Sequence, residues 1–132
     1  ERYLREGADY AANCIATALP RGFETEVFSA NGLAEVAAIA EKPYEREHVT
    51  PYFYQHPERF KLEFIDIEAE FARGDLRLVV DTPEDLELIR AVYARLGRES
   101  NNFSIWDVMQ LMDREPELRT INAGIQQKKL GQ

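Results

Sequence analysis

The stretch from Leu76 to Gly97 limits what this chain can fold into more than any other, because it predicts a strand that leads directly into a helix. Residues 76–80 are apolar apart from one arginine, and Asp81 follows at the carboxyl end of the predicted strand. Thr82 is a natural N-cap residue, and Pro83 suits the first helical position. The apolar stripe predicted for this helix consists of Leu86, Ile89, Val92, Tyr93 and Leu96. A strand that feeds a capped helix is the repeating unit of α/β proteins.

The rest of the chain also alternates between strand and helix patterns. Further strands are predicted at 8–15, 24–28 and 60–64. Further helices are predicted at 1–6, 30–41, 43–50 and 105–115, with Ser29 and Ser104 as N-caps. Pro51 is expected to end, kink or restart the helix before it. No linker-like break is visible, so we expect one α/β domain across residues 1–132.

Charge and cysteine content exclude several classes of protein. The 132 residues carry a formal net charge of −8 and no basic stripe, which argues against nucleic-acid binding. Cys14 is the single cysteine, so neither an internal disulfide nor a cysteine zinc site is expected, and a reducing cytoplasmic setting is predicted. No apolar run approaches eighteen residues, so no membrane association is expected.

Asp81 has two interpretations on sequence alone. Ligands of open α/β sheets bind at the carboxyl ends of strands, where a carboxylate can hold Mg²⁺ against phosphates. Equally, Asp81 can be a turn or capping residue before the helix, because Asp-Thr-Pro is good capping chemistry in its own right. The residues by themselves favour the capping interpretation.

Two further clusters carry groups that suit a sugar or a phosphate. Residues 44–52 interleave charged and aromatic side chains, and the planar guanidinium of Arg46 suits a carboxylate or a phosphate. Glu24 and Glu26 are predicted on one face of a strand, where paired carboxylates can bind hydroxyls. The alternatives are a solvated helix face for the first cluster and the exposed side of an edge strand for the second.

Several strings of residues, in this order and spacing, resemble the spore-coat polysaccharide biosynthesis cytidylyltransferases. They are Leu-Pro-Arg at 19–21, Glu-Thr-Glu-Val-Phe-Ser at 24–29, Tyr-Glu-Arg-Glu-His-Val-Thr-Pro-Tyr at 44–52, Val-Asp-Thr-Pro-Glu-Asp-Leu-Glu-Leu at 80–88 and Pro-Glu-Leu at 116–118. Similar residues continue at 121–122 and 127–128, so the likeness spans nearly the whole chain. The string at 44–52 is the most specific, whereas Asp-Thr-Pro-Glu-Asp-Leu recurs among many sugar nucleotidyltransferases.

The resemblance implies a fold, a reaction and a set of site residues. The fold is the C-terminal part of a Rossmann-like nucleotide-sugar transferase with three αβα layers. The reaction is transfer of CMP from CTP to a sugar, with release of pyrophosphate and with Mg²⁺ as cofactor. Asp81 matches the family's metal-binding aspartate. Residues 43–67 match a segment that builds the sugar pocket and the dimer contact, which implies a homodimer and makes Glu26, Arg46, Glu47 and His48 substrate-binding candidates.

The chain also departs from the family pattern. The Gly-rich loop that cradles CTP and the first metal-binding aspartate have no counterpart in this sequence. In addition, residues 22–27 keep the acid of the family's Gly-Leu-Asp-x-Glu-Val string but lengthen its side chain to glutamate. We therefore expect these 132 residues to be inactive alone. The competing hypothesis is a non-catalytic α/β module for dimerisation or protein contact.

Overall fold

The computed structural model describes residues 1–13, 19–97 and 102–126, and its mixture of helices with a small sheet confirms the predicted α/β class. Cys14 and residues 127–128 lie outside the described residues. Contacts divide the chain into two compact units. We call the one that contains described residues 1–13 and 24–67 the sheet unit, and the one that contains 19–23 and 68–126 the helix unit. The sequence predicted one domain because no Gly- or Ser-rich linker separates these units.

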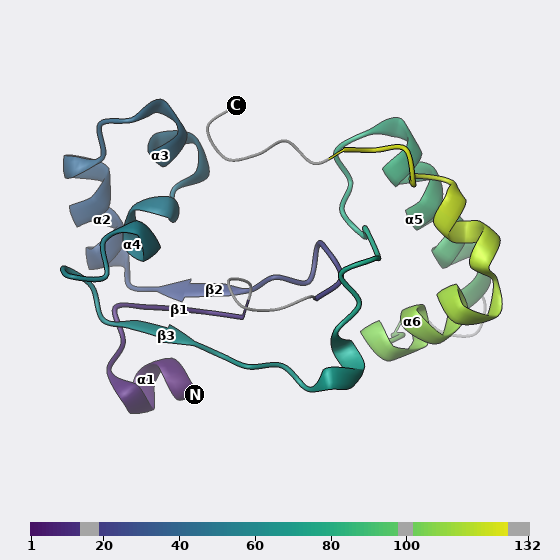
Figure 1. Cartoon of the computed structure of the whole chain (residues 1–132), viewed down its shortest axis with the longest axis horizontal. Helices are drawn as coiled ribbons and strands as arrows, with labels where there is room; N and C mark the ends of the chain where they lie inside the picture. Colours follow the sequence, from purple (N-terminus) through teal and green to yellow (C-terminus); the bar gives the residue numbers. More distant parts are fainter. Residues whose placement is uncertain (14–18, 98–101, 127–132) are drawn as a thin grey trace. The chain divides into compact units, whose positions relative to one another are not determined.

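The sheet unit is built on a mixed sheet of three short strands. β1 (Tyr10–Ala12) lies in the centre, antiparallel to β2 (Glu26–Phe28) and parallel to β3 (Leu62–Phe64), as Figure 1 shows. Tyr10 is aligned with Phe28 on one side and with Leu62 on the other. β1 is buried along its whole length, and it is paired with a neighbouring strand along each edge.

Four short helices accompany this sheet: α1 (Arg2–Glu6), α2 (Ala30–Ile39), α3 (Pro43–His48) and α4 (Pro51–Gln55). The Ser29 hydroxyl accepts a hydrogen bond from the Gly32 amide at 2.9 Å, as expected for the N-cap of α2. Pro51 restarts the chain as α4, which settles the three options that the sequence left open. The core of the unit packs Phe53 of α4 onto the Tyr10 ring, with the ring centroids 5.5 Å apart.

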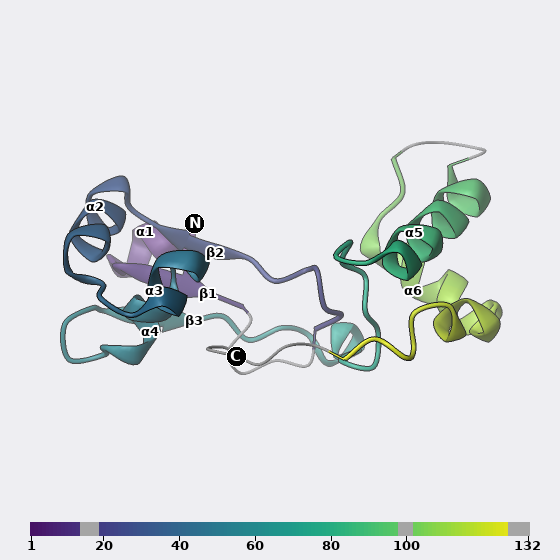
Figure 2. The same cartoon turned by 90° about the horizontal axis from the view of Figure 1, so that it is seen from above.

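The helix unit packs α5 (Pro83–Leu96) beside α6 (Ile105–Arg114), and both views place these helices side by side (Figure 2). Two short 3-10 helices, η1 (Ala69–Phe71) and η2 (Pro116–Thr120), complete the unit. Thr82 and Ser104 cap α5 and α6 as predicted, each paired with an aspartate three residues later. The buried apolar side chains are Leu76, Leu78, Leu88, Val92, Val108, Met109, Leu111, Met112 and Leu118.

Some predicted details are wrong. Residues 76–80 do not form a regular strand, because within the described residues their only β-type pairing is an isolated bridge to Arg21. The Arg21 amide donates to the Leu76 carbonyl at 2.9 Å, and the Leu78 amide donates to the Arg21 carbonyl at 2.7 Å. On α5, Leu86 and Tyr93 of the predicted apolar stripe are exposed, whereas Leu88 is buried. The helix is rotated because the side chain of Asp85 turns inward with Leu88 and Val92. Glu24 precedes β2, so it does not share a strand face with Glu26.

Gly22 allows the backbone to approach residues 76–80 closely. Its φ is +108°, and a Cβ at this position would lie 2.6 Å from the carbonyl oxygen of Leu78. An L side chain is excluded both by the backbone angle and by this contact. Glycine therefore permits Arg21 to pair with the residues that precede Asp81.

Candidate functional site

The start of α5 is organised by a buried carboxylate, that of Asp85. One oxygen accepts from Arg77 Nε at 2.9 Å and from Asn122 Nδ2 at 2.9 Å. The other accepts from Arg77 Nη2 at 2.8 Å and from the backbone amides of Asp81 and Thr82 at 3.1 and 3.2 Å. Five hydrogen bonds thus replace the water that this charge loses on burial.

Electrostatics keep the Asp85 carboxyl ionised. The side-chain hydrogen bonds from Arg77 hold its pKa well below the usual range and outweigh burial, which alone would raise the pKa. The same pairing raises the pKa of Arg77. The side-chain amide of Asn122 also donates to the Arg77 carbonyl at 3.0 Å, so Asn122 contacts both residues of the buried ion pair.

Asp81 stands at the edge of this buried network. Its backbone amide is held by Asp85, and Oδ2 of its side chain accepts from Arg77 Nη2 at 2.9 Å. The side chain is nonetheless 61% exposed. Asp81 therefore lies directly before the N-cap of α5 but not at the end of a regular strand, and a buried network that the sequence did not reveal fixes its backbone.

The donor set around Asp81 suits only part of a Mg²⁺ shell. Within residues 1–13, 19–97 and 102–126, no three His, Cys, Asp or Glu side chains gather closely enough to enclose a metal ion. Mg²⁺ is commonly held by one or two carboxylates together with phosphate oxygens and water. One exposed carboxylate matches that requirement, and the role of Asp81 as a metal ligand stays a prediction.

The three candidates in α3 differ in their surroundings. The Arg46 guanidinium donates to the carbonyls of Ala37 and Ala40 at 3.3 and 3.4 Å, so it covers the C-terminal end of α2. Glu47 and His48 are exposed. A small hollow of about 100 Å³ lies beside Arg46 and is lined by Leu33, Val36, Ala37, Ala40, Glu45, Arg46 and Val49.

Glu26 is the fourth candidate, and it joins the sheet to the α3–α4 junction. Its carboxylate accepts hydrogen bonds from the Tyr10 hydroxyl and, at 3.1 Å, from the Thr50 hydroxyl. Glu26, His48 and Thr50 belong to the sheet unit, whereas Asp81 belongs to the helix unit.

The junction between α3 and α4 is strained at Val49. Its φ of 65° and ψ of −52° form a γ-turn of the rare type with positive φ, closed by the 2.7 Å hydrogen bond from the Thr50 amide to the His48 carbonyl. A β-branched residue is a strong outlier in this region. This turn presents Thr50 to Glu26 and leaves His48 at the surface.

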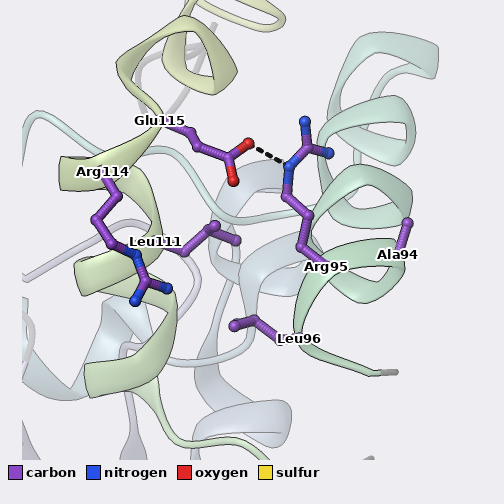
Figure 3. A pocket seen from close by; sticks show the side chains of 6 residues that line it. All are labelled: Ala94, Arg95, Leu96, Leu111, Arg114 and Glu115. Atoms are coloured by element: carbon purple, nitrogen blue, oxygen red, sulfur yellow. Dashed lines mark hydrogen bonds and ion pairs between the residues drawn. The ribbon is translucent and has the colours of Figure 1, made fainter. Parts of the chain in front are cut away.

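The helix unit also has a hollow that lies elsewhere. It measures about 600 Å³ and is lined by Ala94, Arg95, Leu96, Leu111, Arg114 and Glu115. Figure 3 shows the ion pair between Arg95 and Glu115 at one side and Arg114 at the other. None of the predicted metal- or substrate-binding residues lines it.

Sequence reasoning missed Arg77, Asp85 and Asn122 as parts of this site. The available signal was the single arginine within the apolar run 76–80, which needs a buried acid as its partner. Nothing in the sequence brings Asn122 to Asp85 from 37 residues away.

No helix within the described ranges has the length and apolar character needed to cross a bilayer.

Comparisons with known proteins agree on one group of relatives. The chain is 32% identical over 132 residues to an uncharacterised protein of Methanocaldococcus jannaschii, a match that covers 97% of this chain and 51% of that protein. It is 32% identical over 121 residues to the spore coat polysaccharide biosynthesis protein SpsF of Bacillus subtilis, covering 91% and 49%. No family model matches the chain.

A solved structure of a cytidylyltransferase also matches the chain. A cytidylyltransferase from Leptospira borgpetersenii superposes with a TM-score of 0.75 and 26% identity, over 98% of this chain and 51% of that one. These matches confirm the predicted resemblance and the predicted α/β nucleotide-sugar transferase fold. The chain spans about half the length of the proteins it matches.

The buried carboxylate predicts a contrast between two aspartates. Asp85→Ala should lower the free energy of unfolding by about 3 kcal/mol, because it leaves the Arg77 charge buried without its partner. Asp81→Ala should change it far less, because exposed ion pairs contribute little. Urea unfolding of both variants checks this, and equal losses would contradict it.

The same pair predicts how stability depends on pH. Because the pKa of Asp85 is lower in the folded than in the unfolded chain, its contribution is complete above the unfolded pKa and is lost as pH falls toward the folded pKa. The gap in stability between wild type and Asp85→Ala should therefore narrow in acid. A gap that does not change between neutral pH and pH 3 would contradict the buried ion pair.

Val49 predicts a reversal of the usual order of alanine and glycine. Val49→Gly should be more stable than Val49→Ala by about 1 kcal/mol, because both remove the same side chain but only glycine tolerates φ near 65°. At Val27 in β2, alanine should be the more stable replacement. Thermal unfolding of the four variants checks this, and the same order at both positions would contradict the strained turn.

Proposed function

We propose that this chain, which is related to the cytidylyltransferases, forms part of an enzyme that transfers CMP from CTP to a sugar and releases pyrophosphate. The observation that carries the proposal is the match of nearly the whole chain to a solved cytidylyltransferase. The relative named for spore coat polysaccharide biosynthesis supports a product used in a surface polysaccharide. Location in the cytoplasm and a homodimeric state remain predictions from the sequence.

In this proposal Asp81 contributes one oxygen ligand to Mg²⁺. The ion supplies charge neutralisation to the phosphates when it is bound. Asp81 suits this role because its carboxylate is exposed while its backbone amide is fixed by the buried Asp85. The chain's part is thus to hold a negatively charged oxygen at the beginning of α5, where the ion and the nucleotide can reach it.

The sugar is proposed to bind near residues 43–67 of the sheet unit. All four predicted substrate residues are exposed. Glu47 and His48 are the stronger candidates, because the side chains of the other two already form hydrogen bonds within the sheet unit. Glu26 and Arg46 already hold Thr50 and the end of α2, so we assign them to shaping the pocket as much as to contacting the sugar. The same segment is proposed to contribute to a dimer contact.

Activity is proposed to need more than these 132 residues, because no Gly-rich phosphate loop is present in them. The test therefore uses the natural protein that carries this chain, supplied with CTP, Mg²⁺ and a panel of acidic and amino sugars. Pyrophosphate release should require CTP, and Asp81→Ala should reduce it on the order of 100-fold. Release is measured with a coupled phosphate assay.

Glu84→Ala provides the matched control, because Glu84 is an exposed acid in the first turn of the same helix. It should retain wild-type release. If a folded protein releases no pyrophosphate with any nucleoside triphosphate, the enzyme proposal fails and a non-catalytic dimerisation or protein-contact module replaces it. If Asp81→Ala matches Glu84→Ala, the reaction stands and the Asp81 side chain keeps only its structural ion pair with Arg77.

A further inference from the structure

We propose that Arg77 is a positioning residue for the nucleotidyl transfer, holding the Asp81 carboxylate by one oxygen so that the other faces a divalent cation. This inference rests on the function proposed above. It concerns a side chain that contacts no reacting group itself. Its evidence is the geometry of Arg77, Asp81 and Asp85 at the start of α5.

Arg77 connects the exposed aspartate with the buried one. Its Nη2 donates to Asp81 Oδ2 at 2.9 Å and to Asp85 Oδ2 at 2.8 Å, while its Nε donates to Asp85 Oδ1 at 2.9 Å. A guanidinium is planar, so the two bonds to Asp85 fix its orientation and therefore the direction of the bond to Asp81. Lysine, a flexible point charge, lacks this fixed geometry.

The arrangement leaves Asp81 Oδ1 available. Within the part of the chain that the structure describes, the Asp81 side chain forms one hydrogen bond, which Oδ2 accepts. Because the side chain is 61% exposed, Oδ1 can accept a ligand from solution. A metal-binding carboxylate is commonly oriented in this way, with a second residue holding the oxygen that the ion does not use.

Charge explains why a cation could bind so near an arginine. Asp85 is completely buried and pairs with Arg77 through two hydrogen bonds, so it offsets the guanidinium charge. The three side chains together carry one net negative charge, and it resides at the solvent-exposed Asp81. Asn122 holds Asp85 from a third side and keeps this arrangement in place.

The experiment measures Mn²⁺ affinity by electron paramagnetic resonance, with the natural protein that carries this chain saturated with CTP. Arg77→Lys should weaken Mn²⁺ binding about tenfold while the protein remains folded by circular dichroism. Arg90→Lys is the control, because Arg90 is an exposed arginine within α5, whereas Arg77 precedes that helix, and it should bind as wild type. Unchanged affinity in Arg77→Lys would overturn the proposal.

Two further measurements separate this proposal from the proposed function. Asp81→Asn should abolish the Mn²⁺ site; if it does not, both the metal role of Asp81 and the role of Arg77 fall. If it does and Arg77→Lys has no effect, only the role of Arg77 falls. If Arg77→Lys unfolds, NMR spectra of the wild-type protein test the proposal instead. The guanidinium N–H signals of Arg77 should persist with Mg²⁺ bound. Loss of these signals would show that the ion displaces Arg77, which would overturn the proposal.

Discussion

The buried ion pair between Arg77 and Asp85 is the interaction on which the helix unit depends. It fixes the segment before α5, the first turn of α5 and the loop that contains Asn122, all through one carboxylate. Such a pair is costly to bury and is favourable only when its remaining hydrogen-bonding groups are satisfied. Here the Asp85 carboxylate accepts five hydrogen bonds. One of them comes from the Asp81 amide, so the backbone at Asp81 is fixed by the same contacts that make burial of the ion pair favourable.

In the sheet unit, too, a carboxylate that accepts more than one hydrogen bond links separate segments of the chain. The Glu26 carboxylate accepts hydrogen bonds from the hydroxyls of Tyr10 and Thr50. The second bond holds the residue that directly follows the strained turn at Val49. Strain of this kind persists only where surrounding contacts determine the conformation, and it is common at functional sites. Burial of Thr50 beside Glu26 and stacking of Phe53 in the core supply those contacts, so His48 is presented by a defined backbone.

The sequence predicted the local signals well. Thr82, Ser104 and Ser29 cap helices where expected, because an N-cap depends on residues within one turn. It failed where long-range contacts decide. Within the described residues, the segment expected to be a strand at 76–80 forms only an isolated bridge to Arg21. Asp85 turns inward to Arg77, and α5 is rotated as a result.

The candidate site divides along the same line. Asp81 could be named from its motif, but Arg77, Asp85 and Asn122 could not be joined to it, because Asn122 is 37 residues from Asp85. Arg46 could be chosen for its guanidinium, yet its carbonyl partners on α2 depend on how two helices pack. Sequence therefore identified the chemical groups, and the fold determined which of them hold the others.

Hydrogen exchange at the Asp81 backbone amide tests the central claim most directly. This amide belongs to an exposed residue outside the helix, and it donates to the buried Asp85 carboxylate at 3.1 Å. We predict that it exchanges far more slowly than an unstructured peptide amide, as slowly as amides within α5, and that Asp85→Ala removes this protection. Exchange at the unstructured rate in wild type would contradict the account, because Asp81 would then not be held by the buried pair.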